Sequence, residues 1–436
     1  MNWLHNLFDF EGQQTTLARE LVAGLTTFTA MSYIVVVNPA ILSAAGIPAG
    51  PSFVATALTA VFGCYFMGLY ANRPFAIAPY MGENAFIAFT VCKLLGFRWQ
   101  TALAAVFIAG ALFVLMTVLH LRQWVVEGVP TSLRYSFAVG IGLFLTFIGL
   151  NQSGLVVLGA AGAPVRAGQL TSHPALIAIF GFVLLAVLII RKVPGAILIG
   201  IVITAMAAFV AGVAAPPHAV VSMPPSIAPI LWQLDFRGAL TWHAFPVVLT
   251  IFVMAFVDTM GTLIGLSARA GFLDPEGQLP QIERPMLVDA ITTCIAPAIG
   301  TSVSGAFVES ATGIEAGGRT GFTVLITGTC FLLTLFFSPF VAAIPAQAYG
   351  PALIIVGLFM LAPITHIDFG DFTESIPAFA VVSLMAFTFN IAIGICAGFV
   401  LYPICKLVGG KSSHLKPGLW VLTLLSLLFF VFYPYH

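Results

Sequence analysis

The chain has 436 residues, of which 60% are hydrophobic and only 7% are charged, and its mean hydropathy is +1.07. Soluble domains carry about 25% charged residues, so this composition excludes a mainly soluble protein and predicts a polytopic protein embedded in a lipid bilayer. Lys+Arg and Asp+Glu are equal at 16 each, which argues against a nucleic-acid partner.

Apolar runs that are long enough, or nearly long enough, to cross a bilayer recur along the chain, since a spanning helix takes about 20 residues. In chain order we expect them at 20–45, 51–72, 80–95, 99–121, 132–150, 173–190, 194–214, 243–268, 285–300, 303–316, 320–343, 347–364, 374–389, 390–408 and 417–434. Two of these runs, 80–95 and 303–316, are short and interrupted by Gly or Pro. The chain is therefore expected to be all-α, with two broken segments.

The broken runs are the third and the tenth, so they hold the same place in two successive sets of seven. Three weak matches support a repeat: VATALTAVFGCYFMG (54–68) resembles VDAITTCIAPAIG (288–300), VGIGLFLTFIGL (139–150) resembles LIIVGLFMLAPI (353–364), and NAFIA (84–88) resembles GAFVE (305–309). An odd number of segments per repeat makes the halves inverted. Broken segments at matching positions of two halves point to the binding site of a transporter.

The last run, 417–434, follows two complete sets of seven. It is either an extra C-terminal crossing or a helix in the membrane interface, and the sequence leaves both open.

Basic residues indicate the orientation. With the N-terminus in the cytoplasm, twelve basic residues fall inside and four outside, which agrees with the positive-inside rule. The inside set is Arg19, Arg73, Arg122, Arg134, Arg191, Lys192, Arg269, Arg284, Arg319, Lys406, Lys411 and Lys416, and the outside set is Lys93, Arg98, Arg166 and Arg237.

Glu309 and Asp258 are the strongest candidates for function. A charged side chain within a bilayer costs several kcal/mol, so such residues mark functional sites by default. Glu309 lies in the broken run, where its carboxylate could accept two ring N–H donors of a heterocycle and could also take up a proton. Asp258 lies in the eighth run, and we expect a proton or substrate site there. The alternative reading for both is a carboxylate that holds helices together.

Glu83 and Asn84 are the matching polar pair in the other broken run, APYMGENAF. Asn84 could bind the edge of a heterocycle or cap the short helix. Glu83 could face a cavity or reach toward Glu309 or Asp258. Phe86 and Phe307 follow Ala at matching points of the two broken runs, and either could stack on an aromatic ligand or serve packing alone.

Three further sets of carboxylates favour structural roles. Asp289 begins the polar face of the ninth run, beside two threonines that suggest internal hydrogen bonding. Glu315 and Arg319 are spaced as an i,i+4 ion pair. Asp371 and Glu374 are expected to cap the start of a helix at the interface.

We expect no metal and no cofactor. The six cysteines lie in apolar runs with no CxxC spacing and no Cys/His pairing, so they are interpreted as small buried hydrophobic residues.

The runs GTSVSGAFVESATGIEAGGRTGFT, FVDTMGTLIGLSARAGFLD, APYMGENAF and DFTESIPAF together resemble the nucleobase–cation symporter-2 family. The closer likeness is to its AzgA-like branch of adenine, guanine and hypoxanthine permeases, over essentially the whole chain. The resemblance implies the UraA-like fold of seven plus seven inverted segments, with short strands before half-helices three and ten and the purine between them. It also implies proton symport into the cell and a homodimer.

The resemblance further implies a core domain and a gate domain. The core would comprise 1–123 and 243–344, the gate 124–242 and 345–416, and 417–436 would be an extra C-terminal helix.

Carried over by position, Glu309 matches the binding glutamate of the tenth segment, Asn84 the asparagine of the third, and Asp258 the aspartate of the eighth. Two positions depart from the pattern: Ala255 stands where many relatives have a second polar residue, and Glu83 stands where many have Leu. We hypothesise that Glu83 supplies the polarity that Ala255 lacks and so changes which purine is preferred.

The sequence therefore predicts a secondary active transporter, in the plasma or inner membrane, that imports purine nucleobases by proton symport with alternating access. Glu309 and Asp258 are the candidates for proton coupling. The first alternative is an inorganic-anion exchanger on the same architecture, against which the lack of Lys or Arg in the broken runs argues. An intramembrane aspartyl protease using Asp258 and Asp289 would leave the broken helices and inverted halves unexplained.

Overall fold

The structure is a computed structural model that describes residues 8–119, 129–160, 163–274 and 279–432. Within these ranges, nine helical spans are long and apolar enough to cross a membrane, and three shorter apolar helices accompany them. The chain is thus a multi-pass membrane protein. All the expected runs are helical over at least part of their length.

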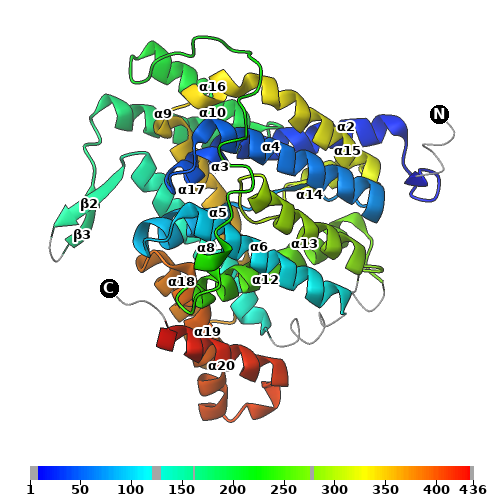
Figure 1. Ribbon diagram of the computed structural model, residues 1–436, viewed down its shortest axis with the longest axis vertical. Helices are drawn as coiled ribbons and strands as arrows, with labels where there is room; N and C mark the ends of the chain where they lie inside the picture. The colour runs from blue at the N-terminus through cyan, green and yellow to red at the C-terminus, as the bar shows by residue number, and fades with distance from the viewer. Residues whose placement is uncertain (1–7, 120–128, 161–162, 275–278, 433–436) are drawn as a thin grey trace.

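The first half contains the following elements (Figure 1): α2 Leu17–Met31, α3 Ile34–Ser43, α4 Ala49–Phe66, π-helix η1 Met67–Ala71, β1 Ile77–Pro79, α5 Met81–Ala85, π-helix η2 Phe86–Leu94, α6 Trp99–Val118, α8 Thr131–Gln152, β2 Val156–Ala160, β3 Ala163–Ala167, α9 His173–Ile190, α10 Ala196–Val210 and α11 Phe236–Ala239.

The second half contains α12 Phe245–Ala270, α13 Glu283–Ala298, β4 Ser304–Ala306, α14 Ser310–Glu315, α15 Gly321–Thr334, 3-10 helix η3 Leu335–Phe337, α16 Ser338–Ala343, α17 Ala346–Leu361, 3-10 helix η4 Ala362–His366, α18 Phe372–Phe387, α19 Ile391–Val408, 3-10 helix η5 Ser412–His414 and α20 Pro417–Phe432.

Two three-residue strands join the broken segments at the centre of the molecule. β1 and β4 pair antiparallel, with Ala78 opposite Gly305, and all six residues are buried. The pairing continues past both strands, because the Tyr80 N–H donates to the carbonyl of Val303 and the Phe307 N–H to that of Ala76. The strands implied by the family resemblance are therefore present, and they hold α5 and α14 together.

The helices pack as inverted halves require. α6, the fourth segment, lies against α13, the ninth, and α15, the eleventh, lies against α4, the second. α8 and α17, the fifth and the twelfth, also lie against each other. The expected fold of seven plus seven inverted segments with an additional C-terminal helix is confirmed.

Two local features differ from the sequence expectation. The first run is split into α2 and α3 at Ser32 and Tyr33. Pro39 inside α3 cannot donate to the carbonyl of Val35, which weakens the helix just after this break. The stretch 151–172, which lies between two of the expected apolar runs, contains the hairpin β2–β3, which extends from the helical body in Figure 1. Alternation of apolar and polar residues is too slight there to predict it.

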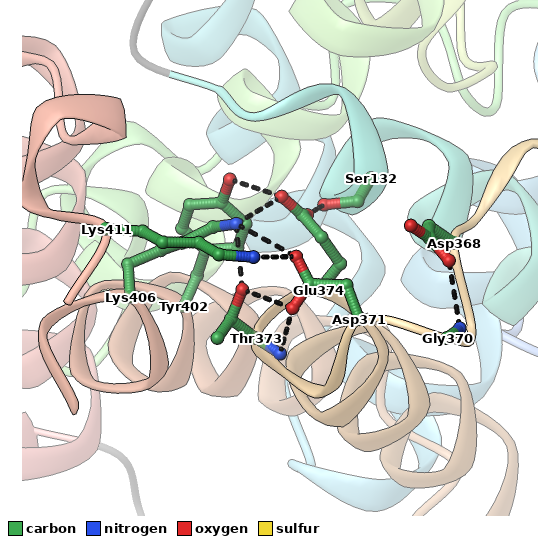
Figure 2. A network of polar contacts seen from close by, with 9 residues as sticks. All are labelled: Ser132, Asp368, Gly370, Asp371, Thr373, Glu374, Tyr402, Lys406 and Lys411. Carbon is green, nitrogen blue, oxygen red and sulfur yellow. Dashed lines mark hydrogen bonds and ion pairs between the residues drawn. The ribbon is translucent and has the colours of Figure 1, made fainter. Parts of the chain in front are cut away.

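A buried ion pair fastens the ends of three helices (Figure 2). Lys406 of α19 is 1% exposed, and its Nζ lies 2.5 Å from Glu374 Oε1 of α18 and donates to Thr373 Oγ1 at 2.9 Å. The hydroxyl of Ser132, in the first turn of α8, donates to the same Glu374 carboxylate. Lys406 was placed on the cytoplasmic side in the count of basic residues, and its ammonium group is enclosed by polar partners within the protein.

Asp371 caps the start of α18, as expected. Its Oδ1 accepts from the Thr373 N–H at 2.9 Å, and its Oδ2 lies 2.6 Å from the Nζ of Lys411. The ammonium of Lys411, together with the hydroxyl and N–H of Thr373, holds the pKa of Asp371 well below its usual range. Glu374 was expected to share the capping role, and it forms the ion pair with Lys406 instead.

Glu20 is a fully buried carboxylate of α2 that accepts hydrogen bonds from the start of α15. It receives the N–H groups of Arg319 and Thr323, at 2.9 Å and 3.2 Å, and the hydroxyls of Thr320 and Thr323. The first N–H groups of a helix have no partner within the helix, so this carboxylate satisfies donors that would otherwise be buried without one.

We expect Glu20→Ala to lower stability by about 3 kcal/mol or more, because each unsatisfied buried donor costs about 1–3 kcal/mol. Thermal unfolding of the purified protein in detergent measures the effect. Glu11→Ala, which removes an exposed carboxylate, is the control and should change little. A melting temperature for Glu20→Ala equal to that of the control would contradict this role.

Candidate functional site

Glu309 lies where the chain turns from β4 into α14, at the N-cap position of that six-residue helix. Its carboxylate is only partly buried, and Oε1 accepts a hydrogen bond from Tyr33 Oη at 2.5 Å. The neighbouring Val308 is 63% exposed. The helix is short because the strand pairing occupies the residues before it and Gly317, with a φ of 103°, ends the turn that follows it. An accessible carboxylate, oriented by a phenol, is thus held in the middle of the fold.

Sequence reasoning did not identify Tyr33. It lies at the break between α2 and α3 and is 1% exposed. A phenol hydroxyl in an apolar helix needs a polar partner, and that requirement was the available signal.

Asp258 is in the middle of α12, which packs against α14, and its side chain is partly exposed. Gly261 and Gly265 follow at helical spacing and are exposed. A Cβ added to either glycine would meet no atom of the described residues within 4 Å. Open space therefore borders α12 at these two glycines, on the face of the helix that carries Asp258.

Asn84 is fully buried in α5 and belongs to a chain of polar side chains. Its amide donates to Asn38 Oδ1, and the Asn38 amide donates to Thr56 Oγ1 at 2.8 Å and to Thr301 Oγ1 at 3.0 Å. The alternative reading of Asn84 as a helix cap is wrong, because Asn84 lies inside α5 and the N-cap position is Tyr80. Asn38, a single polar residue in the apolar run VVVNPAIL, could have been noticed in the sequence.

Glu83 is 1% exposed and faces Asp258 across the contact between α5 and α12. Neither carboxylate oxygen of Glu83 accepts a hydrogen bond from an N–H or O–H donor of the described residues. Of the three partners considered from sequence, which were a cavity, Glu309 and Asp258, the structure places Glu83 beside Asp258. Ala255, one turn before Asp258, is also buried.

The two phenylalanines occupy different surroundings. The Phe307 ring is 5% exposed and stacks on Tyr80, with ring centroids 6.1 Å apart and an interplanar angle of 11°. Phe86 is 1% exposed and lies near Pro246 and Val247 at the start of α12. Phe307 therefore follows directly on the strand pair beside Glu309, whereas Phe86 packs toward another part of the fold.

Asp289 holds β4 in place. Its Oδ2 accepts from Thr259 Oγ1 at 2.8 Å and from the Ala306 N–H at 3.2 Å. Thr293, one helical turn later on α13, donates to the Ser304 carbonyl at 2.7 Å. These contacts agree with the structural reading that was favoured for Asp289.

Glu315 does not pair with Arg319. Its Oε1 lies 2.6 Å from Nη1 of Arg269 at the end of α12, and both side chains are mostly exposed. α14 ends at Glu315, so the residue four positions later does not continue its face. Arg319 instead donates to the carbonyls of Ile314 and Gly318. The expected i,i+4 pair is wrong for this reason.

The chemical character of the site is acidic and polar. Among the described residues, no Lys, Arg or His forms an ion pair with Glu83, Asp258 or Glu309. The same part of the chain contains no group of three or more His, Cys, Asp or Glu side chains arranged to hold a metal, and its cysteines are free. Partly exposed carboxylates beside aromatic rings can accept N–H donors from a flat, neutral heterocycle.

Comparison with known proteins gives clear relatives. A family described as "Permease family" matches residues 18–401. The chain is 38% identical to the adenine permease AdeP of Escherichia coli, over 99% of this chain and 97% of that one. It is 37% identical to the guanine/hypoxanthine permease PbuG of Bacillus subtilis, over 98% of this chain and 100% of that one.

Among solved structures, the chain resembles the transmembrane domain of a cyanobacterium bicarbonate transporter, BicA. The TM-score is 0.66 at 15% identity, covering 88% of this chain and 97% of that one. At this identity the likeness concerns the fold alone.

Proposed function

The chain belongs to the permease family, in the AzgA-like branch that its motifs resemble, and from this premise we propose that it imports purine nucleobases by proton symport with alternating access. The family comprises transporters, so the chain is a permease and not an enzyme. Adenine, guanine and hypoxanthine are the substrates that the names of its relatives suggest.

The accessible carboxylate of Glu309 is the observation that carries the proposed binding site. Adenine, guanine and hypoxanthine all present ring N–H groups that a carboxylate can accept, and hydrogen bonds to a charged group are worth about 1.5–3 kcal/mol each. Asp258 offers a second, partly exposed acceptor on α12, and Phe307 offers an apolar ring next to Glu309. Asn84 and Phe86, both buried, would support the site from α5 and η2.

The proposed motion is of a core domain, 1–123 and 243–344, against a gate domain, 124–242 and 345–416. The strand pair joins α5 and α14 within the proposed core. The proposed gate is built on α8 packed against α17 and α18. Contacts between the domains include Gly82 of α5 against Ile141 of α8, where a Cβ on the glycine would clash at 2.5 Å. At this glycine the two helices approach closely with no side chain of α5 between them, which suits two bodies that slide.

A cytoplasmic N-terminus follows from the basic residues and is also part of the proposal. Arg122, one of the twelve assigned to that side, lies outside the described residues. A homodimer is proposed from the family resemblance.

The anion-exchanger alternative shares the fold with the bicarbonate transporter but not the site chemistry. An anion site needs cationic or backbone donors, whereas carboxylates repel anions. The basic residues of α12 and η2 lie toward the helix ends, at Arg269 and Lys93. The purine reading is therefore the better supported of the two.

Uptake into proteoliposomes tests the proposed function. We expect saturable uptake of radiolabelled hypoxanthine, guanine or adenine, and a protonophore should remove accumulation against a gradient. Bicarbonate and sulfate should neither be transported nor compete. Purine entry that a protonophore leaves unchanged would refute proton symport, and transport of the anions instead would favour the alternative.

A further inference from the structure

Glu83 is a buried carboxyl group without a conventional partner. It is 1% exposed, and its two oxygens receive no N–H or O–H hydrogen bond from the described residues. Buried carboxylates normally accept several such bonds, as Glu20 does from α15 in this protein. Hydrogen-bond donors therefore do not explain how the carboxyl group of Glu83 is stabilised in this buried position.

The neighbour of Glu83 is a second carboxyl group. Asp258 lies within hydrogen-bonding reach of it, from α12. A hydrogen bond between two carboxyl groups requires that one of them carries a proton, because an ionised carboxylate has acceptors only. Two ionised carboxylates within hydrogen-bonding reach also repel each other, which favours retention of one proton by the pair.

Among the described residues no cation forms an ion pair with Glu83 or Asp258. α5 packs on α3, α8, α12 and η2. α3 meets it with the neutral Asn38, α8 with Ile141. The ionisable groups that interact nearby are Tyr80 and, through Tyr80, Asp289, and neither brings a positive charge. Within the described residues no metal-binding cluster includes these carboxylates. We infer that a proton is the cation that neutralises the negative charge of this pair.

The two members of the pair differ in access. Glu83 is buried, whereas Asp258 is partly exposed and adjoins the open face of α12 at Gly261 and Gly265. A proton can thus arrive from water at Asp258 and pass from Asp258 to Glu83. It can leave again by way of Asp258. The transfer changes only O–H bonds: water gives the proton to a carboxylate and later takes it back.

We propose that Glu83 and Asp258 together form a proton-binding site in which Glu83 holds the proton that is coupled to transport. This deepens the proposed function and rests on it for the coupling. It assigns Glu83 to the proton and leaves Glu309 as the purine acceptor. Glu83 acts on the purine only through Asp258, so it is a positioning and proton-binding residue.

Glu83→Gln tests the coupling. The amide has the shape of a protonated carboxyl group and can donate to Asp258, so purine binding and purine exchange between preloaded vesicles should persist. Accumulation driven by an imposed pH gradient should be lost, where the wild type gains up to about tenfold per pH unit for one proton and a neutral substrate. Glu315→Gln, which removes an exposed carboxylate of α14, should accumulate purine as the wild type does. Wild-type accumulation by Glu83→Gln would overturn the proposal.

Infrared difference spectroscopy between acid and alkaline pH gives a readout that needs no transport. The wild type should show the C=O band of a buried protonated carboxyl group, Glu315→Gln should keep it, and Glu83→Gln should lack it. Absence of the band from the wild type, or its presence in Glu83→Gln, would overturn the proton site even if Glu83→Gln were too unstable to assay for transport. Failure of the wild type to transport purines, with the band present, would refute the proposed function and the coupling but not the proton site.

Discussion

Glu309→Ala is expected to abolish saturable purine uptake while the protein still folds. The carboxylate is proposed to accept two ring N–H groups, and two charge-assisted hydrogen bonds are together worth about 3 kcal/mol or more, or a loss of affinity of about 100-fold or more. Folding should survive, because the side chain is only partly buried and makes one side-chain hydrogen bond within the described part of the chain, to Tyr33.

Uptake of radiolabelled hypoxanthine and binding to the purified protein measure the loss, and the elution profile in detergent reports on folding. Glu315→Ala is the matched control, since it removes an exposed carboxylate from the same short helix, and it should keep uptake near the wild-type level. Saturable uptake by Glu309→Ala at normal affinity, in a folded protein, would show that the purine binds elsewhere.

Tyr33→Phe separates orientation from recognition. The phenol donates to Glu309 at 2.5 Å and carries no charge, so its loss should weaken purine affinity by a factor of about 3 to 10, corresponding to one ordinary hydrogen bond. A loss as large as that of Glu309→Ala would mean that the hydroxyl itself binds substrate.

The fold could be predicted because its signals are local. The apolar runs, the two interrupted segments and the excess of basic residues on one side are each read from neighbouring residues, and the family motifs then supplied the connection between the halves. The strands β1 and β4 were implied by the resemblance and not by the residues themselves, since strands of three residues have too little periodicity to detect, and their pairing was not predicted.

Candidate site residues could be identified from the sequence only where a residue is costly in its own segment. Glu309, Asp258 and Glu83 were identified because a carboxylate within an apolar run needs an explanation. The partners of these residues were not identified: Tyr33 for Glu309 and Asn38 for Asn84 lie in a segment distant in the sequence. A tyrosine or asparagine also costs less in a membrane helix than a carboxylate does, so its presence is a weaker signal.

Lys406 is a further residue whose partners could not be identified from the sequence. Its position near the end of an apolar run and its positive charge placed it on the cytoplasmic side, and nothing in the sequence indicated that its side chain is buried. The structure encloses its ammonium group because Glu374 and Thr373 reach it from α18, while Tyr402 lies one turn before it on α19. Burial of a charge depends on those partners, and no local pattern reveals them.

Lys406→Met is expected to destabilise the protein by about 3 kcal/mol, near the lower end of the cost of breaking a buried ion pair. The methionine preserves an apolar stem of similar length, so the loss comes from Glu374, whose carboxylate keeps the hydroxyls of Ser132 and Tyr402 but loses its only cation among the described residues. The side chain of Glu374 is 21% exposed, which lets water compensate part of the cost.

Thermal unfolding of the purified protein in detergent measures this effect, and Lys411→Met is the matched control. Lys411 pairs with Asp371 in the same network, but its side chain is 42% exposed, so its loss should cost no more than about 1 kcal/mol. The double variant Lys406→Met/Glu374→Gln should regain part of the stability, because the uncompensated charge is then gone. Equal melting temperatures for Lys406→Met and Lys411→Met would mean that burial adds nothing to the strength of this pair, and the joining of α8, α18 and α19 would then rest on apolar packing alone.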